Sequence, residues 1–220
     1  MTEHRALSEA AYRQYLDGLL AGDRDACRRL FRGWLDAGME LHTLYEDVVR
    51  RSLYEVGTLW EQGRITVAAE HLATAITESL LPLSYDRLFA TPRNGKSAVI
   101  ACTANEYHQI GGKMVADLFE LHGWRGHFLG ANTPLADLLS LVGQKHPDVV
   151  ALSVSVAFSL DTLAAAIEAL RHTFPTLPIL VGGQAFRYGG MGCLDGIADV
   201  HFLSSTGELI DWIRRDALAA

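Results

Sequence analysis

The sequence predicts an α/β protein in which an N-terminal four-helix bundle precedes a Rossmann-like, doubly wound domain. Apolar residues recur at helical spacing from residue 8 to about residue 90, whereas short apolar runs alternate with helical patterns after residue 97. Residues 92–96 between these regions are rich in turn formers. Alternating strands and helices imply a parallel sheet covered by helices. We therefore expect a helical-bundle domain over residues 1–91 and a flavodoxin-like domain with five parallel strands over residues 97–220.

The first region divides into four helices at polar residues or glycines. The predicted helices cover residues 8–20, 25–37, 41–61 and 66–82. Gly63 follows the third helix as expected of a C-terminal cap, and Thr66 is a suitable N-cap for the fourth. Because the helices have similar lengths and short connections, we expect an antiparallel bundle.

The second region alternates strands with helices to its end. The predicted strands cover residues 98–102, 127–129, 149–156, 179–181 and 200–203, and the predicted helices cover residues 112–122, 135–145, 160–174 and 207–218. The apolar runs are typical of strands that are covered on both faces.

Composition limits the function classes. The 220 residues carry a net charge of −7, which gives no basic stripe for phosphate backbones and disfavours direct nucleic-acid binding. The N-terminus lacks signal-peptide features and no apolar stretch reaches about 18 residues, so we expect a soluble, cytoplasmic protein without a membrane segment. Cys27, Cys102 and Cys193 are scattered, which favours reduced, mostly buried thiols over disulfides or a zinc knuckle.

The elbow between the first predicted strand and its helix carries Glu106, His108 and Gly111. In open α/β sheets, ligands bind beyond the carboxyl ends of the strands, which is where this elbow lies. Taken alone, the pattern also fits a solvated loop histidine beside an acid. The glycine fingerprints of dinucleotide folds and P-loops are both absent from this turn.

A histidine in this position suits a metal, with the carboxylate two residues away holding the other ring nitrogen. One histidine cannot complete a zinc site, which uses four ligands, so the metal would arrive already ligated inside a cofactor. Ser153 and Ser155 after the third strand, and Gly182 and Gly183 after the fourth, leave space for a large flat ligand. Serines and glycine pairs at strand ends are also common turn material.

Taken together, these residues resemble a known family. Glu106-x-His108-x-x-Gly111, followed by Ser153 and then Gly182-Gly183, resembles the cobalamin-binding domain of B12-dependent proteins. Residues 59–71, LWEQGRITVAAEH, are similar to the helical-bundle segment that precedes this domain in methionine synthases, corrinoid proteins and B12 photoreceptors.

The resemblance implies a role for each residue. His108 would be the lower axial ligand to cobalt, in place of the cofactor's own dimethylbenzimidazole, and Glu106 would support it. Ser153, Ser155, Gly182 and Gly183 would line the slot for the displaced nucleotide tail, and Trp60, Glu70 and His71 would face the upper side of the corrin. Trp60 also fits a core aromatic residue, whereas burying the adjacent Glu70 and His71 on an apolar helix would be costly without a polar partner.

Within this family, the segment FLGANTP at residues 128–134, together with the spacing of Trp60, Glu70 and His71, looks most like the adenosylcobalamin-dependent light-sensing regulators. Methyl-carrying corrinoid proteins more often have an aspartate and a following Gly-Lys in the elbow. The resemblance thus implies a light sensor and not an enzyme. The alternative is a corrinoid methyl-carrier subunit of a B12-dependent methyltransferase system. A mutase is not expected, because the chain has no barrel for radical chemistry on a substrate.

The sequence departs from the light-sensing repressors in two ways. Those proteins carry an N-terminal DNA-binding module, which we do not expect before Ser8, and they can have a cobalt-ligating histidine where this chain has Glu61. We therefore expect light to switch a contact with a protein partner or a second copy. Adenosylcobalamin is the expected cofactor, and biliverdin is a candidate second chromophore because related photocobilins hold a bilin beside the B12.

Overall fold

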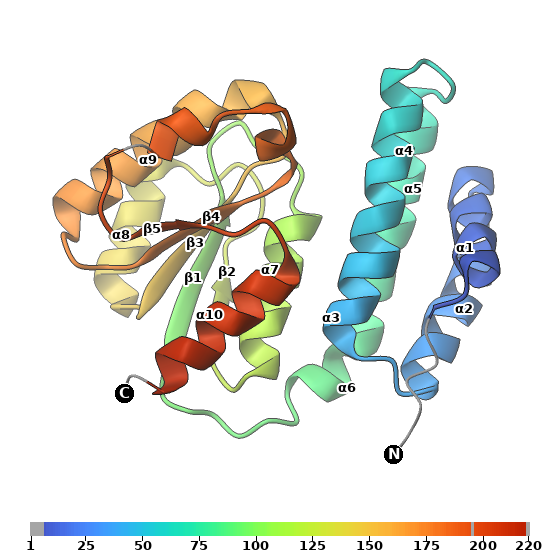
Figure 1. Cartoon of the computed structure of the whole chain (residues 1–220), viewed down its shortest axis with the longest axis horizontal. Helices are drawn as coiled ribbons and strands as arrows, with labels where there is room; N and C mark the ends of the chain where they lie inside the picture. The colour runs from blue at the N-terminus through green and yellow to red at the C-terminus, as the bar shows by residue number, and fades with distance from the viewer. Residues whose placement is uncertain (1–6, 195, 219–220) are drawn as a thin grey trace. The chain divides into compact units, whose positions relative to one another are not determined.

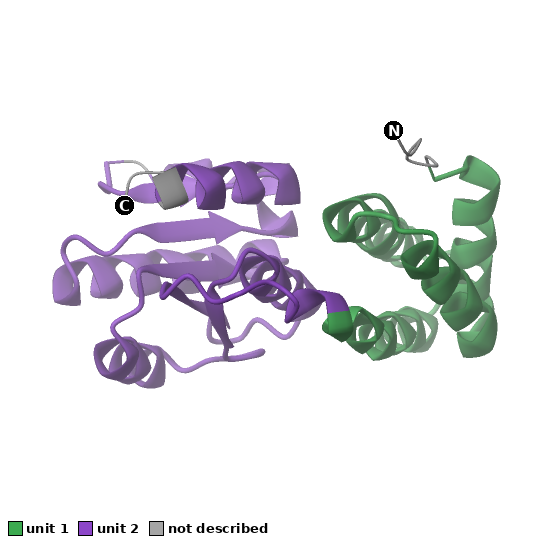
Figure 2. Ribbon diagram, turned by 90° about the horizontal axis from the view of Figure 1, so that it is seen from below, with its two compact units in different colours: residues 1–86 green, residues 87–220 purple. Residues whose placement is uncertain are grey.

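The structure is a computed structural model that describes residues 7–194 and 196–218. The chain divides into two compact units, Met1–Asp86 and Arg87–Ala220 (Figure 2). The first unit is helical, and the second contains a parallel sheet with helices on both faces (Figure 1). The predicted fold class is therefore confirmed.

The first unit contains the four predicted helices. They are α1 (Glu9–Ala21), α2 (Arg24–Asp36), a continuous third helix formed by α3 (Leu41–Thr43), the π-helical segment η1 (Leu44–Arg50) and α4 (Arg51–Glu61), and α5 (Val67–Leu80). Two short helices follow, η2 (Leu81–Ser84) and α6 (Tyr85–Leu88). The π-helical segment was not predicted, because the apolar spacing continues through it.

The helix ends follow their capping residues. The hydroxyl of Thr66 accepts a hydrogen bond from the amide of Ala69 at 3.2 Å, as expected of an N-cap. Gly63 follows α4 with a φ of 68°, the left-handed conformation that favours glycine after a helix. Both predicted caps are confirmed.

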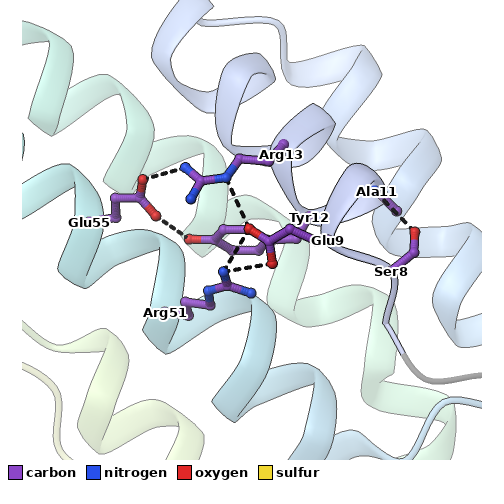
Figure 3. Close-up of polar contacts among 7 residues, drawn as sticks. All are labelled: Ser8, Glu9, Ala11, Tyr12, Arg13, Arg51 and Glu55. Carbon is purple, nitrogen blue, oxygen red and sulfur yellow. Dashed lines mark hydrogen bonds and ion pairs between the residues drawn. The ribbon is translucent and has the colours of Figure 1, made fainter.

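A polar cluster joins α1 to α4 (Figure 3). The hydroxyl of Tyr12 donates to Oε2 of Glu55 at 2.9 Å, and Arg13 pairs with Oε1 of the same carboxylate at 2.6 Å. The guanidinium of Arg51 lies 3.6 Å from the centroid of the Tyr12 ring and pairs with Glu9. Although Tyr12 is fully buried, its hydroxyl therefore has a charged partner at the edge of the helical core.

The sheet of the second unit has the strand order β2-β1-β3-β4-β5, and all its strands are parallel. The strands are β1 (Ser97–Cys102), β2 (Arg125–Phe128), β3 (Val149–Ser153), β4 (Ile179–Gly182) and β5 (Val200–Phe202). Helices α7 (Ile110–Leu121) and α10 (Thr206–Leu218) pack together on one face, and α8 (Leu135–Lys145) and α9 (Leu160–Thr173) pack together on the other. The strand order reverses between β1 and β3, which lie side by side.

The third strand is shorter than predicted. The pattern indicated a strand over residues 149–156, but β3 ends at Ser153. Beyond it, the backbone amides of Ser155 and Val156 turn to the carboxylate of Glu106 instead of continuing the ladder. Three short 3-10 helices in the loops, η3 (Ala157–Ser159), η4 (Gln184–Tyr188) and η5 (Met191–Leu194), were not predicted either.

Residues 92–96, predicted as a linker, make hydrogen bonds within the second unit. The amide of Asn94 donates to the carbonyl of Gly123 at 2.9 Å. Arg93 pairs with Glu120 and Lys96 pairs with Asp216. These contacts hold the segment against the C-terminal ends of α7 and α10.

The thiols of Cys27 and Cys102 are free and buried, as predicted, whereas the side chain of Cys193 lies outside the described part of the chain. Within the described ranges, no helix is long and apolar enough to cross a bilayer. The residues before position 7, where no DNA-binding module was expected, also lie outside the described ranges.

Candidate functional site

The candidate site lies in the elbow between β1 and α7, at the carboxyl edge of the sheet. β1 has β2 on one side and β3 on the other, so the elbow stands where the strand order reverses. In doubly wound sheets this switch point opens a crevice in which ligands bind. The fold therefore places the predicted elbow at the expected ligand position.

Glu106 ties the elbow to the loop that follows β3. Its side chain is fully buried, and Oε1 accepts a hydrogen bond from the backbone amide of His108 at 2.8 Å and lies 2.6 Å from Nδ1 of the His108 ring. Its Oε2 accepts from the amide of Ser155 at 2.7 Å and from that of Val156 at 3.2 Å. One carboxylate thus organises backbone from two strand ends and one imidazole.

These hydrogen bonds keep Glu106 ionised. Burial by itself raises the pKa of this carboxyl group, but the hydrogen bonds from the His108 ring, the Ser155 amide and the His108 amide outweigh it and leave the pKa below its ordinary value. An ionised carboxylate can only accept, so Nδ1 of His108 is the donor and carries the proton. The lone pair that can bind a metal is then on Nε2, an assignment that follows from the hydrogen bond.

His108 is held firmly, yet it remains accessible. Its side chain is 55% exposed, although the carboxylate that faces it is fully buried. No cluster of three or more histidine, cysteine, aspartate or glutamate side chains suited to a metal ion occurs within residues 7–194 and 196–218. A single accessible imidazole fits a metal that brings its other ligands in a cofactor, and it does not fit a structural zinc site with four protein ligands.

The glycines of the elbow let α7 begin directly against the strand ends. A Cβ on Gly111 would lie 3.4 Å from Oγ of Ser153, and one on Gly112 would lie 3.0 Å from the ring of Phe128. Ser153 is buried beneath this first helical turn at the end of β3. The structure therefore brings the predicted residues Gly111 and Ser153 together.

Backbone packing alone accounts for the glycine pair after β4. Gly183 has a φ of 122°, and a Cβ there would lie 1.9 Å from the carbonyl oxygen of Val154. A Cβ on Gly182 would lie 2.9 Å from the carbonyl oxygen of Leu203. Neighbouring protein backbone therefore requires both glycines, and their contact with a nucleotide tail stays a prediction.

Sequence reasoning missed some groups at this edge. The backbone amides of Ser155 and Val156 bind Glu106, a role that was not predicted, while the predicted place of Ser155 in the slot for the nucleotide tail stays a prediction. Three buried hydroxyls in these loops were also overlooked. Within the described ranges they have no hydrogen-bond partner, and they belong to Thr103, Thr133 and Ser159. The available signal was their position in the loops that follow predicted strands.

Of the three predicted residues of the helical unit, Trp60 and His71 are exposed, whereas Glu70 is largely buried. Trp60 on α4 is 47% exposed, so it is not a core residue. On α5, Glu70 accepts a hydrogen bond from Thr74 at 2.9 Å, and the side chain of His71 is 74% exposed. The Glu70 side chain is only 20% exposed, but it has polar partners in Thr74 and in His71, whose Nε2 lies 3.5 Å from Oε2 of Glu70. The contact of the three residues with a cofactor stays a prediction.

Comparison with known families agrees with this site. A family model described as the B12 binding domain matches residues 96–209, just over half of the chain, and a second model with the same description matches residues 11–83. The chain belongs to the B12 binding domain family. The resemblance inferred from Glu106, His108 and Gly111 is thereby confirmed.

Curated relatives of this B12-binding chain fall into two groups. The HTH-type transcriptional repressors CarA and CarH of Myxococcus xanthus are 40% identical over 131 residues and 33% identical over 145 residues. The alignments cover 59% and 65% of this chain and 45% and 48% of the repressors, so the chain spans about half the length of these relatives. Dimethylamine corrinoid protein 3 of Methanosarcina acetivorans is 22% identical over 151 residues, covering 63% of this chain and 68% of that protein.

The fold of this B12-binding chain also has a solved counterpart. The monomethylamine corrinoid protein of Methanosarcina barkeri superposes with a TM-score of 0.79 at 12% identity, covering 96% of this chain and all of that one. At this identity the similarity supports the fold alone.

Proposed function

We propose that this chain is a cobalamin-binding signalling protein that holds its cofactor base-off, with Nε2 of His108 as the lower ligand to cobalt. The observation that carries the proposal is the accessible His108 imidazole whose Nδ1 lies 2.6 Å from the buried Glu106 carboxylate, in a chain of the B12 binding domain family. Gly111, Ser153, Ser155, Gly182 and Gly183 would border the nucleotide tail. Trp60, Glu70 and His71 would act from the helical unit.

The signal that we propose is light, with adenosylcobalamin as the cofactor. The sequence resemblance to light-sensing regulators supports this choice, as does the higher identity to two transcriptional repressors than to a corrinoid protein. When bound, the cofactor supplies a light-sensitive bond between cobalt and its upper ligand. His108 would hold the cobalt and Glu106 would orient the His108 ring, and a protein partner or a second copy of the chain would read the change.

The test uses the full chain reconstituted with adenosylcobalamin in the dark. We expect an absorption spectrum of histidine-ligated cobalt in the wild type and of unligated, base-off cobalt in His108→Ala, with a lower affinity in the variant. The matched control is His146→Ala, which removes another exposed histidine of the second unit, after α8. An identical cobalt spectrum in wild type and His108→Ala would refute the ligand assignment.

Illumination of the reconstituted wild type should then alter its absorption spectrum and its mass or shape in solution. A bound bilin would add an absorption band of its own.

The second candidate is a methyl-carrying corrinoid protein. It is favoured by the match to dimethylamine corrinoid protein 3, which covers 68% of that protein. A carrier would present the cofactor to a methyltransferase and would not need light. Unchanged mass, shape and partners after photolysis that absorbance has verified would therefore favour the carrier over the sensor.

A further inference from the structure

The loop that follows β2 runs alongside the elbow beyond the end of the strand. The amide of Cys102 donates to the carbonyl of Gly130, and the amide of Thr133 donates to the carbonyl of Cys102, both at 3.1 Å. The loop thus extends the pairing with β1 past the sheet. Because the loop is bonded to both the amide and the carbonyl of Cys102, its position relative to the end of β1 is fixed.

Within this loop, Asn132 makes two hydrogen bonds to the elbow. Its side-chain Oδ1 accepts from the backbone amide of Asn105 at 2.8 Å, and its own amide donates to the carbonyl of Glu106 at 2.8 Å. Asn105 and Asn132 both have left-handed backbones, with φ values of 65° and 50°. Asparagine adopts this region more readily than most residues, so the pair can face each other without a glycine.

These two bonds hold the backbone on both sides of the Glu106 Cα. Asn105 immediately precedes Glu106 in the chain. Asn132 therefore holds the backbone N–H of Asn105 and the backbone carbonyl of Glu106. From this fixed point the Glu106 carboxylate reaches the His108 ring and the amide of Ser155. A shift of the Glu106 backbone would therefore lengthen the hydrogen bond that orients the imidazole.

We propose that Asn132 is a positioning residue for the Glu106–His108 pair, an inference that rests on the proposed role of His108 as the cobalt ligand. Both asparagines are exposed, so water competes for the side-chain bond. Loss of one such bond should lower cobalamin affinity about two- to tenfold. This effect should be smaller than the effect of changing Glu106 itself, because Asn132 acts through Glu106.

If Asn132 served only to tolerate the left-handed backbone, Asn132→Gly should behave like the wild type and Asn132→Ala should not. Asn132→Gly keeps the conformational freedom but removes the acceptor. Asn132→Asp keeps an acceptor oxygen at the same place, and aspartate also tolerates this backbone region. Asn132→Ala removes both properties. If Asn132 orients the elbow, the glycine and alanine variants should behave alike and the aspartate variant should retain the wild-type behaviour.

Two measurements on the full chain test the inference. In the protein without cofactor, hydrogen exchange of the Asn105 amide should be faster in Asn132→Ala and Asn132→Gly, and near the wild-type rate in Asn132→Asp. With cob(II)alamin bound, the nitrogen splitting that an axial imidazole gives in the EPR spectrum should weaken in the first two variants and recover in the third. His146→Ala, which changes another left-handed residue, with a φ of 47°, should alter neither measurement.

An unchanged Asn105 exchange rate in the alanine and glycine variants would overturn the inference, as would unchanged splitting despite faster exchange. Because the exchange measurement needs no cofactor, it decides the Asn132–Asn105 contact separately from cobalamin binding. A wild-type chain that binds no cobalamin would instead refute the proposed function.

Discussion

Oε1 of Glu106 lies 2.6 Å from Nδ1 of His108, and this contact joins a fully buried carboxylate to an imidazole that is more than half exposed. The buried carboxylate and the exposed imidazole therefore have different roles. The carboxylate is fixed by backbone amides from two loops, so it can hold the ring in one orientation. The ring is thus held in place while more than half of it stays accessible, as the proposed cobalt ligand would need to be.

Glu106→Gln should weaken this support. The amide side chain keeps one acceptor oxygen but places an NH₂ group against N–H donors of the elbow or of the loop after β3. Loss of such a supporting group typically lowers metal affinity or activity about 10- to 100-fold. We therefore expect a cobalamin dissociation constant raised by about that factor, measured by titration of the full chain.

The control for this substitution is Glu120→Gln. Glu120 is also a buried carboxylate of the second unit, and it accepts a hydrogen bond from the Gly126 amide at 2.8 Å and pairs with Arg93, away from the elbow. This variant should lose stability without a comparable loss of cobalamin affinity. Equal affinity losses in both variants would show that Glu106 acts only through the stability of the domain.

Gly183→Ala should destabilise the second unit through a steric clash. The new Cβ would lie 1.9 Å from the carbonyl oxygen of Val154, so the strand ends would have to move apart. Gly189 has the same φ of 122°, but a Cβ there would meet nothing within 4 Å, so Gly189→Ala isolates the backbone strain. We expect Gly183→Ala to lower the free energy of unfolding by about 1–3 kcal/mol more than Gly189→Ala does. Urea denaturation of both variants measures the difference, and similar losses would contradict the clash.

The sequence predicted the helices and most strands because their apolar spacing reports burial directly. It failed where a distant partner decides the local structure. The pattern extended the third strand to residue 156, because spacing cannot show that the amides of Ser155 and Val156 bind a carboxylate 49 and 50 residues earlier in the chain. For the same reason, Glu106 and His108 were recognisable within one elbow, whereas the hydrogen bond between Asn105 and Asn132 was not.

The stability of the helical unit should fall at alkaline pH. Burial raises the pKa of Tyr12 and Tyr15 well above the ordinary tyrosine value, and the neighbouring Glu55 carboxylate raises that of Tyr12 further. The folded chain therefore keeps both phenol protons at a pH where the unfolded chain, with a tyrosine pKa of about 10, has released them. Cys27 adds to the effect, because burial raises its pKa from 9.0 to about 11.

The direction in which the free energy of unfolding changes with pH follows from proton linkage. Unfolding releases these protons, so the stabilisation is fully present at neutral pH. The share from Cys27 declines as the pH rises through about 9, and the share from the tyrosines declines as it rises through about 10 and above. Each tyrosine should contribute up to about 1.4 kcal/mol per pH unit to the decline in the free energy of unfolding. Urea denaturation followed by circular dichroism between about pH 8 and pH 11 measures the slope. Tyr12→Phe removes one titrating group, so its stability should fall less steeply with pH even if it is lower at neutral pH. Equal slopes for this variant and the wild type would show that Tyr12 keeps no proton on folding that the unfolded chain releases.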